Sequence, residues 1–296
     1  MDPEDVYDAF LRYALFSRIA YFDFDISNEE LAVIGTSTSH EHEPLYKKVA
    51  FIDRKDTQVW IFKDQDRGGE ELVIAFRGSD SLGDLLSNFC IFPSKFLQMN
   101  GFVHSGYLAS YKAVRNAILY HVMQHVKQGG TRVNVCGHSL GGVCASLCAL
   151  EMSLLTTLDV RCYTFGAPPG GDPQFCVHML NHVPHYYRII HNQDFAPTLP
   201  MVFYKHCDET CQPTKTSSCP KCVILPHTDP ACIGNHSFKT QSLEYIRHHS
   251  IESYIGNLKK IKSRGTISKW STLFKVKPNV YLKGHKGVRD PKAFLK

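Results

Sequence analysis

The stretch of sequence that decides the fold is VNVCGHSLGG, residues 133–142. It starts as a β-rich run and leads into a long apolar stretch of helical character. Between the two, Gly137 and Gly141 enclose Ser139 in a G-x-S-x-G pattern. On a sharp turn from strand to helix, glycines leave room for neighbouring backbone, and the helix N-terminus favours negative charge near the serine. The pattern predicts a nucleophilic serine at the edge of a sheet; the alternative is a glycine-rich turn with an incidental serine.

Strands and helices alternate on both sides of this turn. Apolar β-rich runs predict strands at 59–62, 72–76, 132–136, 160–165 and 186–190. Apolar residues three or four apart predict helices over 6–17, 107–127 and 141–155. The first two strands are joined by a turn-rich segment, which favours a hairpin-like pair. The alternation predicts an α/β fold with a mostly parallel central sheet and helices on both faces.

Composition is that of a globular protein with a sizeable core, because 43% of its 296 residues are hydrophobic and 21% are charged. The acidic start lacks the pattern of a signal peptide, and no apolar run is long enough to span a bilayer. We therefore expect a cytoplasmic protein that can contact a membrane peripherally. Four of the eleven cysteines lie among apolar residues, where we expect them to be buried: Cys136, Cys144, Cys148 and Cys162.

Positive charge is concentrated in residues 259–296, which hold twelve Lys and Arg against one acid, Asp290. The formal net charge is +5, so the rest of the chain is acidic. We treat 1–258 as the catalytic domain and 259–296 as a basic C-terminal tail. The tail favours contact with an anionic membrane surface, and the alternative is a solvated tail that balances the acidic body. Nucleic acid is a weaker candidate partner, because the body is acidic.

Several motifs resemble the class 3 lipases, also called the fungal lipase-like family, over roughly residues 72–255. The matching segments are AFRGS at 75–79, VHSGY at 103–107, GHSLGG at 137–142, TFGAP at 164–168 and YRIIHNQD at 187–194. The resemblance implies an α/β-hydrolase fold and a lipase that hydrolyses carboxylic esters of lipids. It implies a lipid ester as substrate and no cofactor for catalysis. The rival hypothesis is a lipase-like protein that has lost its chemistry and serves as a binding or scaffold module.

The resemblance also assigns roles to individual residues. Ser139 matches the family's nucleophile and Asp194 its triad acid, although Asp194 could instead cap a loop before Pro197. Ser79 matches an oxyanion-hole residue. The backbone N–H of Leu140, directly after the nucleophile, would be the second oxyanion donor.

The catalytic base is the hardest of these residues to choose, since the chain has 16 histidines. The segment HHSIESY, residues 248–254, resembles the family's closing motif. His249 aligns best with the base, and it follows Ser139 and Asp194 in the hydrolase order. His248 and His236 are the rivals.

Two further segments have predicted roles. The first is a lid at about 80–100, which the resemblance implies. Leu82, Leu85, Leu86 and Phe89 form an apolar helical stripe there, and the alternative is an ordinary core helix. The second is a cysteine-rich insertion at about 205–235. Its spacing suggests a structural zinc site, with disulfides or free thiols as alternatives, and the ligands would be Cys207, Cys211, Cys219 and Cys222. The sequence does not indicate an oligomeric state.

Overall fold

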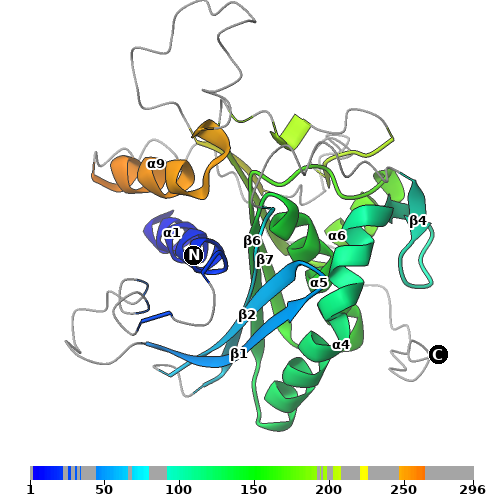
Figure 1. Ribbon diagram of the computed structural model, residues 1–296, viewed down its shortest axis with the longest axis horizontal. Helices are drawn as coiled ribbons and strands as arrows, with labels where there is room; N and C mark the ends of the chain where they lie inside the picture. Colours follow the sequence, from blue (N-terminus) through cyan, green and yellow to red (C-terminus); the bar gives the residue numbers. More distant parts are fainter. Residues whose placement is uncertain are drawn as a thin grey trace, which may run out of the picture.

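The computed structural model describes residues 3–22, 26–27, 31, 34, 45–65, 69–79, 92–191, 194, 196–198, 203–207, 221–225 and 247–263. Within them, helices cover both faces of a seven-stranded sheet (Figure 1). The strands, in spatial order, are β1 (Tyr46–Arg54), β2 (Thr57–Asp64), β3 (Glu71–Phe76), β6 (Arg132–His138), β7 (Asp159–Phe165), β8 (His185–His191) and β9 (Lys221–Leu225). The first three pair antiparallel, and every later pairing is parallel. This confirms the predicted α/β fold with a mostly parallel sheet.

Five helices and a small second sheet complete the described part of the chain. The helices are α1 (Pro3–Ile19), α4 (Ser105–Lys127), α5 (Leu140–Leu155), α6 (Pro173–His182) and α9 (Ile251–Ser263), with a 3₁₀ turn at Ala196–Thr198. The small sheet pairs β4 (Pro93–Lys95) with β5 (Phe102–His104). No helix in the described residues is long and apolar enough to cross a membrane.

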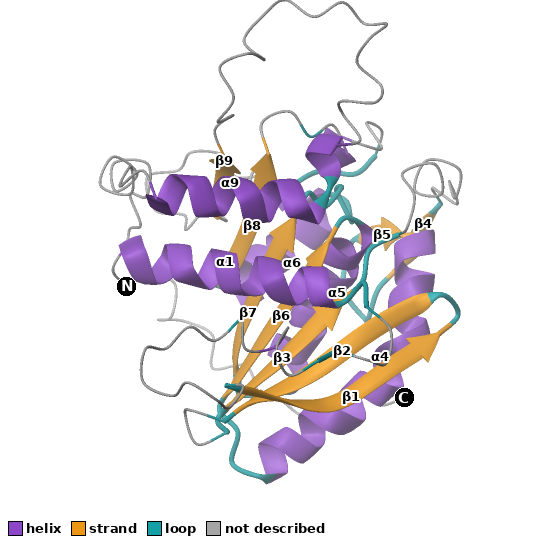
Figure 2. Ribbon diagram, turned by 60° about the vertical axis from the view of Figure 1, so that its left-hand side comes forward, coloured by secondary structure: helices purple, strands orange, loops and turns teal. Residues whose placement is uncertain are grey.

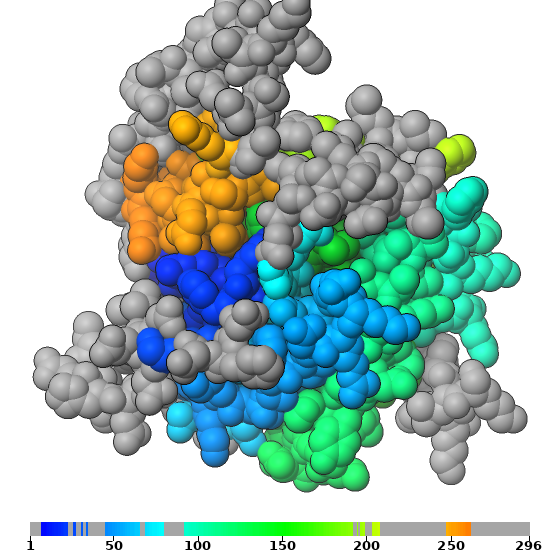
Figure 3. All heavy atoms as spheres, in the orientation of Figure 1, coloured from blue at the N-terminus to red at the C-terminus, as the bar shows by residue number. Residues whose placement is uncertain are grey.

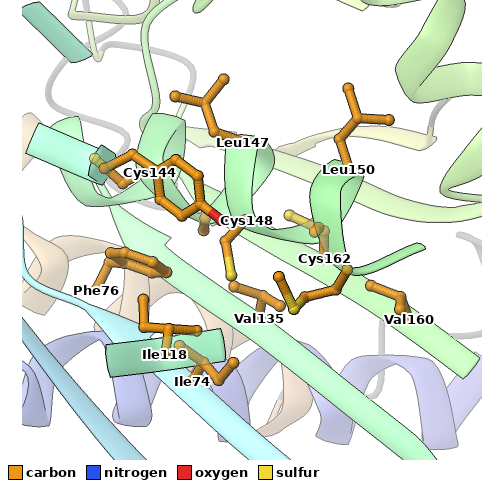
Figure 4. Close-up of a cluster of buried hydrophobic side chains, with 14 of the residues drawn as sticks. Ile74, Phe76, Ile118, Val135, Cys144, Leu147, Cys148, Leu150, Val160 and Cys162 are labelled. Atoms are coloured by element: carbon orange, nitrogen blue, oxygen red, sulfur yellow. The ribbon is translucent and has the colours of Figure 1, made fainter. Parts of the chain in front are cut away.

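Successive side chains along each strand point to opposite faces of the sheet, so the sheet has one hydrophobic core on each face. In β3, Ile74 and Phe76 face the core formed with α4, α5 and α6, whereas Val73 and Ala75 face the core under α1 and α9. Figure 2 shows α1 and α9 side by side on their face of the sheet. The first core is shown in Figure 4, where side chains from the sheet meet α5: Ile74, Phe76, Val135, Cys144, Cys148 and Cys162. The four cysteines predicted to be buried are buried, with Cys136 in the second core.

The N-terminal helix is fixed both to the sheet and to the last helix beside it. In the space-filling view, α1 lies between α9 and the strands β1 and β2 (Figure 3). Its Tyr7 hydroxyl donates to the Leu258 carbonyl of α9 over 2.9 Å. Arg18, near its other end, forms a 2.9 Å ion pair with Glu252. Although they are far apart in sequence, α1 and α9 form a single layer.

Some elements differ from the sequence-based predictions. The strands and helices predicted within the described residues are all present, but β1, β4, β5, α6, β9 and α9 were not predicted. β9 lies inside the cysteine-rich insertion and extends the central sheet by pairing with β8. The last helix reaches Ser263, so the first lysines assigned to the basic tail belong to α9. Residues 80–91 of the predicted lid and residues 264–296 of the tail lie outside the described residues.

Docking of α1 on the sheet can be tested at Phe10, which is 1% exposed. Its ring packs edge-on against Tyr163 and Tyr187, with ring centroids 6.4 and 5.4 Å away. We expect Phe10→Ala to lower the free energy of unfolding by about 3–5 kcal/mol, since it leaves a large cavity. Urea denaturation measures this, with Lys112→Ala on the exposed side of α4 as control. A loss below about 1 kcal/mol would contradict the packing of α1.

Candidate active site

Ser139 occupies the sharp turn between β6 and α5. Its backbone has φ 55° and ψ −127°, a left-handed conformation that costs energy for a residue with a side chain. The turn is held by a 2.9 Å hydrogen bond from the Ser139 N–H to the Phe165 carbonyl of β7. A Cβ atom at Gly137 would collide with the backbone of Gly141 and Gly142. The spacing of small residues around the serine is therefore a requirement of the turn.

Three side chains from distant parts of the chain meet at this turn. The Ser139 hydroxyl lies 2.8 Å from Nε2 of His249. On the other side of the same ring, Nδ1 lies 2.9 and 2.8 Å from the two carboxylate oxygens of Asp194. All three residues are buried, at 3%, 5% and 8% exposed. A proton on Nδ1 would donate to Asp194 and leave Nε2 free to accept the serine proton.

Two further donors orient the Asp194 carboxylate. The Ala196 N–H donates to Oδ1 over 2.9 Å, and the Tyr254 hydroxyl donates to Oδ2 over 2.6 Å. Tyr254 in turn accepts a 3.0 Å hydrogen bond from the His191 N–H at the end of β8. Burial and the neighbouring Asp194 raise the pKa of Tyr254 well above its usual value. Tyr254 therefore keeps its proton and remains a donor to Asp194 throughout the neutral pH range.

Gly166, at the end of β7, allows these groups to come together. It has φ +58°, in the left-handed region that favours glycine. A Cβ atom there would lie 2.6 Å from Asp194 Oδ2, 2.9 Å from the Tyr254 hydroxyl and 3.3 Å from His249 Nδ1. The Asp194–His249 pair thus packs directly against the backbone of β7, and any larger residue would push it away.

The two residues predicted to stabilise an oxyanion are Leu140, directly after Ser139, and Ser79, directly after a glycine that lies close to Ser139. A Cβ atom on Gly78 would be 3.2 Å from Cβ of Ser139, so the segment that follows β3 passes close to the nucleophile. The next residue of this segment is Ser79. Leu140 is the first residue of α5, where backbone N–H groups have no partner within the helix. The first turn of α5 has no acidic residue, and the Ser139 side chain makes no capping hydrogen bond. The positive end of the helix dipole therefore remains available to negative charge that develops at the serine.

His138, next to the nucleophile, is buried behind the base. Its Nε2 donates to the His249 carbonyl over 2.5 Å, and its Nδ1 lies 2.7 Å from the Tyr21 hydroxyl. Burial, and secondarily the neighbouring His249, lower the pKa of His138 well below its ordinary value. His138 is thus a neutral imidazole that supports the loop of the base.

The structure brings together Ser139, Asp194 and His249 and separates His248 from them. The His248 ring stacks on His191, with the two ring centroids 5.0 Å apart. The third candidate base, His236, lies outside the described residues. Sequence reasoning assigned no role to Tyr254, His138, Tyr21 or Gly166. Only Tyr254 had a usable signal, its place five residues after His249 in the closing motif.

The predicted zinc ligands are only partly described. Cys207 is 4% exposed and packs in the core that contains Tyr186. Cys222 belongs to strand β9, whereas Cys211 and Cys219 lie outside the described residues. In the part of the chain that the structure describes, no three His, Cys, Asp or Glu residues are grouped so that they could hold a metal ion. Structural zinc therefore remains a prediction.

Comparison with known proteins identifies the family. Residues 73–204, which include Ser79, Ser139 and Asp194, match the sequence model of the family described as Lipase (class 3). This part of the chain belongs to the class 3 lipase family. The lipase of Rhizomucor miehei is 31% identical over 180 residues, which are 59% of this chain and 46% of the relative. Lipase A of Sodiomyces alcalophilus is 30% identical over 172 residues, 47% of this chain and 41% of its own.

The solved structure of Rhizomucor miehei triacylglyceride lipase has the same fold. It aligns with a TM-score of 0.60 over 84% of this chain and 92% of its own, at 22% identity. The sequence matches are shorter, and in them the chain spans less than half the length of the two curated relatives named above.

The neutral state of His138 predicts a dependence of stability on pH. Its pKa in the folded protein lies below that in the unfolded chain, so the unfolded chain takes up a proton first as pH falls. Stability from this group is thus complete above the unfolded pKa of about 6.5, and below it each pH unit costs up to about 1.4 kcal/mol. Burial lowers the pKa in the same direction for His104, His121 and His125.

We therefore expect a smaller free energy of unfolding at pH 5.5 than at pH 7.5. Urea denaturation at both pH values measures it, and in His138→Gln the difference between the two should shrink. Equal stability of the unsubstituted protein at the two pH values would contradict a neutral, buried His138.

Proposed function

We propose that this protein is a serine carboxylic-ester hydrolase that acts on acyl esters of lipids. The observation that carries the proposal is the His249 ring, which contacts the Ser139 hydroxyl and the Asp194 carboxylate at hydrogen-bond distance. Such an arrangement activates a serine hydroxyl as a nucleophile. Membership of the class 3 lipases supports the same reaction class.

The reaction would proceed by acyl transfer in two steps. His249 takes the proton of Ser139 as the serine oxygen attacks the ester carbonyl, and it then gives that proton to the departing alcohol. Asp194 holds the imidazole in the tautomer with Nδ1 protonated and stabilises its positive form. A water molecule, deprotonated by the same histidine, attacks the acyl-enzyme and releases the carboxylic acid.

Negative charge on the carbonyl oxygen would be stabilised by the Leu140 N–H and by Ser79. Leu140 begins α5, so its N–H lies at the N-terminus of the helix directly after the nucleophile, which supports this role. In other hydrolases the loss of one such donor costs about 3–4 kcal/mol of transition-state stabilisation. The hydrogen bonds form most strongly once the charge has developed, so they favour the transition state over the substrate.

We infer that the substrate is an acylglycerol. A small, mostly buried apolar cluster that includes the residue after the nucleophile favours an apolar acyl group at this site: Tyr107, Leu140, Val143 and Ala167. The solved structure with this fold is named as a triacylglyceride lipase, which favours the same substrate class here. Release of fatty acid from an acylglycerol emulsion, measured beside release from phosphatidylcholine vesicles, distinguishes acylglycerols from phospholipids.

The role of Ser139 is tested by Ser139→Ala. We expect hydrolysis of p-nitrophenyl butyrate to fall by roughly 10⁶-fold, because without the nucleophile the other two residues have nothing to activate. The matched control is Ser153→Ala, which removes a serine at the far end of the same helix whose hydroxyl bonds only locally, to the Leu150 carbonyl. The control should keep normal activity.

Two outcomes would refute the proposal. Substantial activity in Ser139→Ala would show that another residue is the nucleophile. If the unsubstituted protein hydrolyses neither the soluble ester nor any lipid, the alternative of a lipase-like binding protein would replace the enzyme.

A further inference from the structure

The N-terminal helix delivers one side chain to the back of the candidate active site. Tyr21 follows α1 directly and is tied to it by a 3.0 Å hydrogen bond from its own N–H to the Arg18 carbonyl. In Figure 2, α1 runs toward the end of β6 that leads into α5. There the Tyr21 hydroxyl lies 2.7 Å from Nδ1 of His138. The contact joins residues 117 positions apart in the chain.

The hydrogen bonds around His138 allow only one arrangement of protons. The His249 carbonyl can only accept, so Nε2 of His138, 2.5 Å from it, must carry a proton. His138 is neutral, because burial lowers its pKa. Its Nδ1 therefore has no proton and must accept, which makes the Tyr21 hydroxyl the donor.

This proton order links Tyr21 to the base. If the Tyr21 hydroxyl is removed, the single proton of His138 can move to Nδ1. The lone pair on Nε2 would then face the lone pairs of the His249 carbonyl at a separation at which they repel. Displacement of that carbonyl would carry the His249 ring away from Ser139, and small misplacements of reacting groups slow catalysis strongly.

The same side chain lies against the segment that leads to Ser79. A Cβ atom on Gly78 would collide with the Tyr21 hydroxyl and lie 2.6 Å from the His138 carbonyl. The Arg77 guanidinium sits over the Tyr21 ring, 5.8 Å from its centroid. Tyr21 thus contacts the segment leading to Ser79 with its ring and hydroxyl. It contacts His138 through the hydroxyl hydrogen bond and through its ring, whose centroid lies 6.0 Å from that of His138.

We propose that Tyr21 is a positioning residue for ester hydrolysis, which fixes the tautomer of His138 and through it the backbone position of His249. The proposal rests on the function proposed above. Tyr21 acts through His138 and does not touch the reacting atoms. The segment just after α1 thus supports the base, whereas α1 itself covers the sheet.

The test is Tyr21→Phe, which keeps the ring and its contact with Arg77 and removes only the hydroxyl. We expect kcat for p-nitrophenyl butyrate to fall roughly tenfold with little change in KM, because the base is displaced while the substrate contacts are kept. Tyr7→Phe is the matched control. It removes a tyrosine hydroxyl of α1 that bonds the Leu258 carbonyl, and it should leave kcat unchanged.

A second measurement reads the tautomer directly and does not depend on activity. In protein labelled with ¹⁵N-histidine, NMR distinguishes protonation at Nε2 from protonation at Nδ1, and His138→Gln assigns the signal. We expect the Nε2–H form in the unsubstituted protein and in Tyr7→Phe. In Tyr21→Phe we expect a mixture of the two forms or a shift to Nδ1–H.

The two measurements separate failure of this proposal from failure of the proposed function. Absence of Ser139-dependent hydrolysis refutes the function, and the tautomer of His138 still tests the proton order. The positioning role is overturned if Tyr21→Phe keeps the normal kcat, or if it keeps the normal tautomer of His138. It is also overturned if Tyr7→Phe loses as much activity, since the effect would then come from general loosening of α1.

Discussion

The backbone of Ser139 is held at φ 55° between a buried strand and a buried helix, and its surroundings are arranged around that turn. A residue with a side chain adopts this conformation only where neighbouring contacts enforce it. Here the enforcement comes from the hydrogen bond to Phe165, the position of β6 inside the sheet and the close approach of Gly137 to the start of α5. The turn lifts the serine hydroxyl to the carboxyl edge of the parallel strands, where ligands of open α/β sheets are found.

The residues around Ser139 come from the segments that follow β7 and β8, and from the last helix with the residues just before it. Gly166 ends β7 without a side chain, and the space this leaves is filled by Asp194 and His249. His249 lies just before α9, and α9 is held against the sheet by α1. Tyr254 in the first turns of α9 reaches back to Asp194, so the acid and the base are joined by a second route besides their own hydrogen bond. The first and last described helices thus support a site whose nucleophile lies near the middle of the sequence.

The sequence allowed prediction of the elements with strong local patterns. Residues 133–142 predicted the strand, the turn and the helix, because glycine spacing and apolar runs are local properties. β1 was missed because it alternates weakly and carries Lys47 and Lys48 at an exposed edge. β9 was missed because cysteines and prolines dominate its surroundings in the sequence. The choice between His248 and His249 needed the fold, since neighbouring side chains point in different directions and only one reaches Ser139. The contact of Tyr21 with His138 has no local signal, because sequence spacing does not show which distant segments meet.

The central claim is that Ser139 is a nucleophile activated by His249, and reaction with a fluorophosphonate tests it most directly. Such a reagent phosphonylates an activated serine and adds a fixed mass that peptide mass spectrometry can locate. The account predicts one label per chain on the peptide containing Ser139, retained in His248→Ala and lost in His249→Ala. Labelling of a different residue, or loss of the label in His248→Ala with its retention in His249→Ala, would contradict the account.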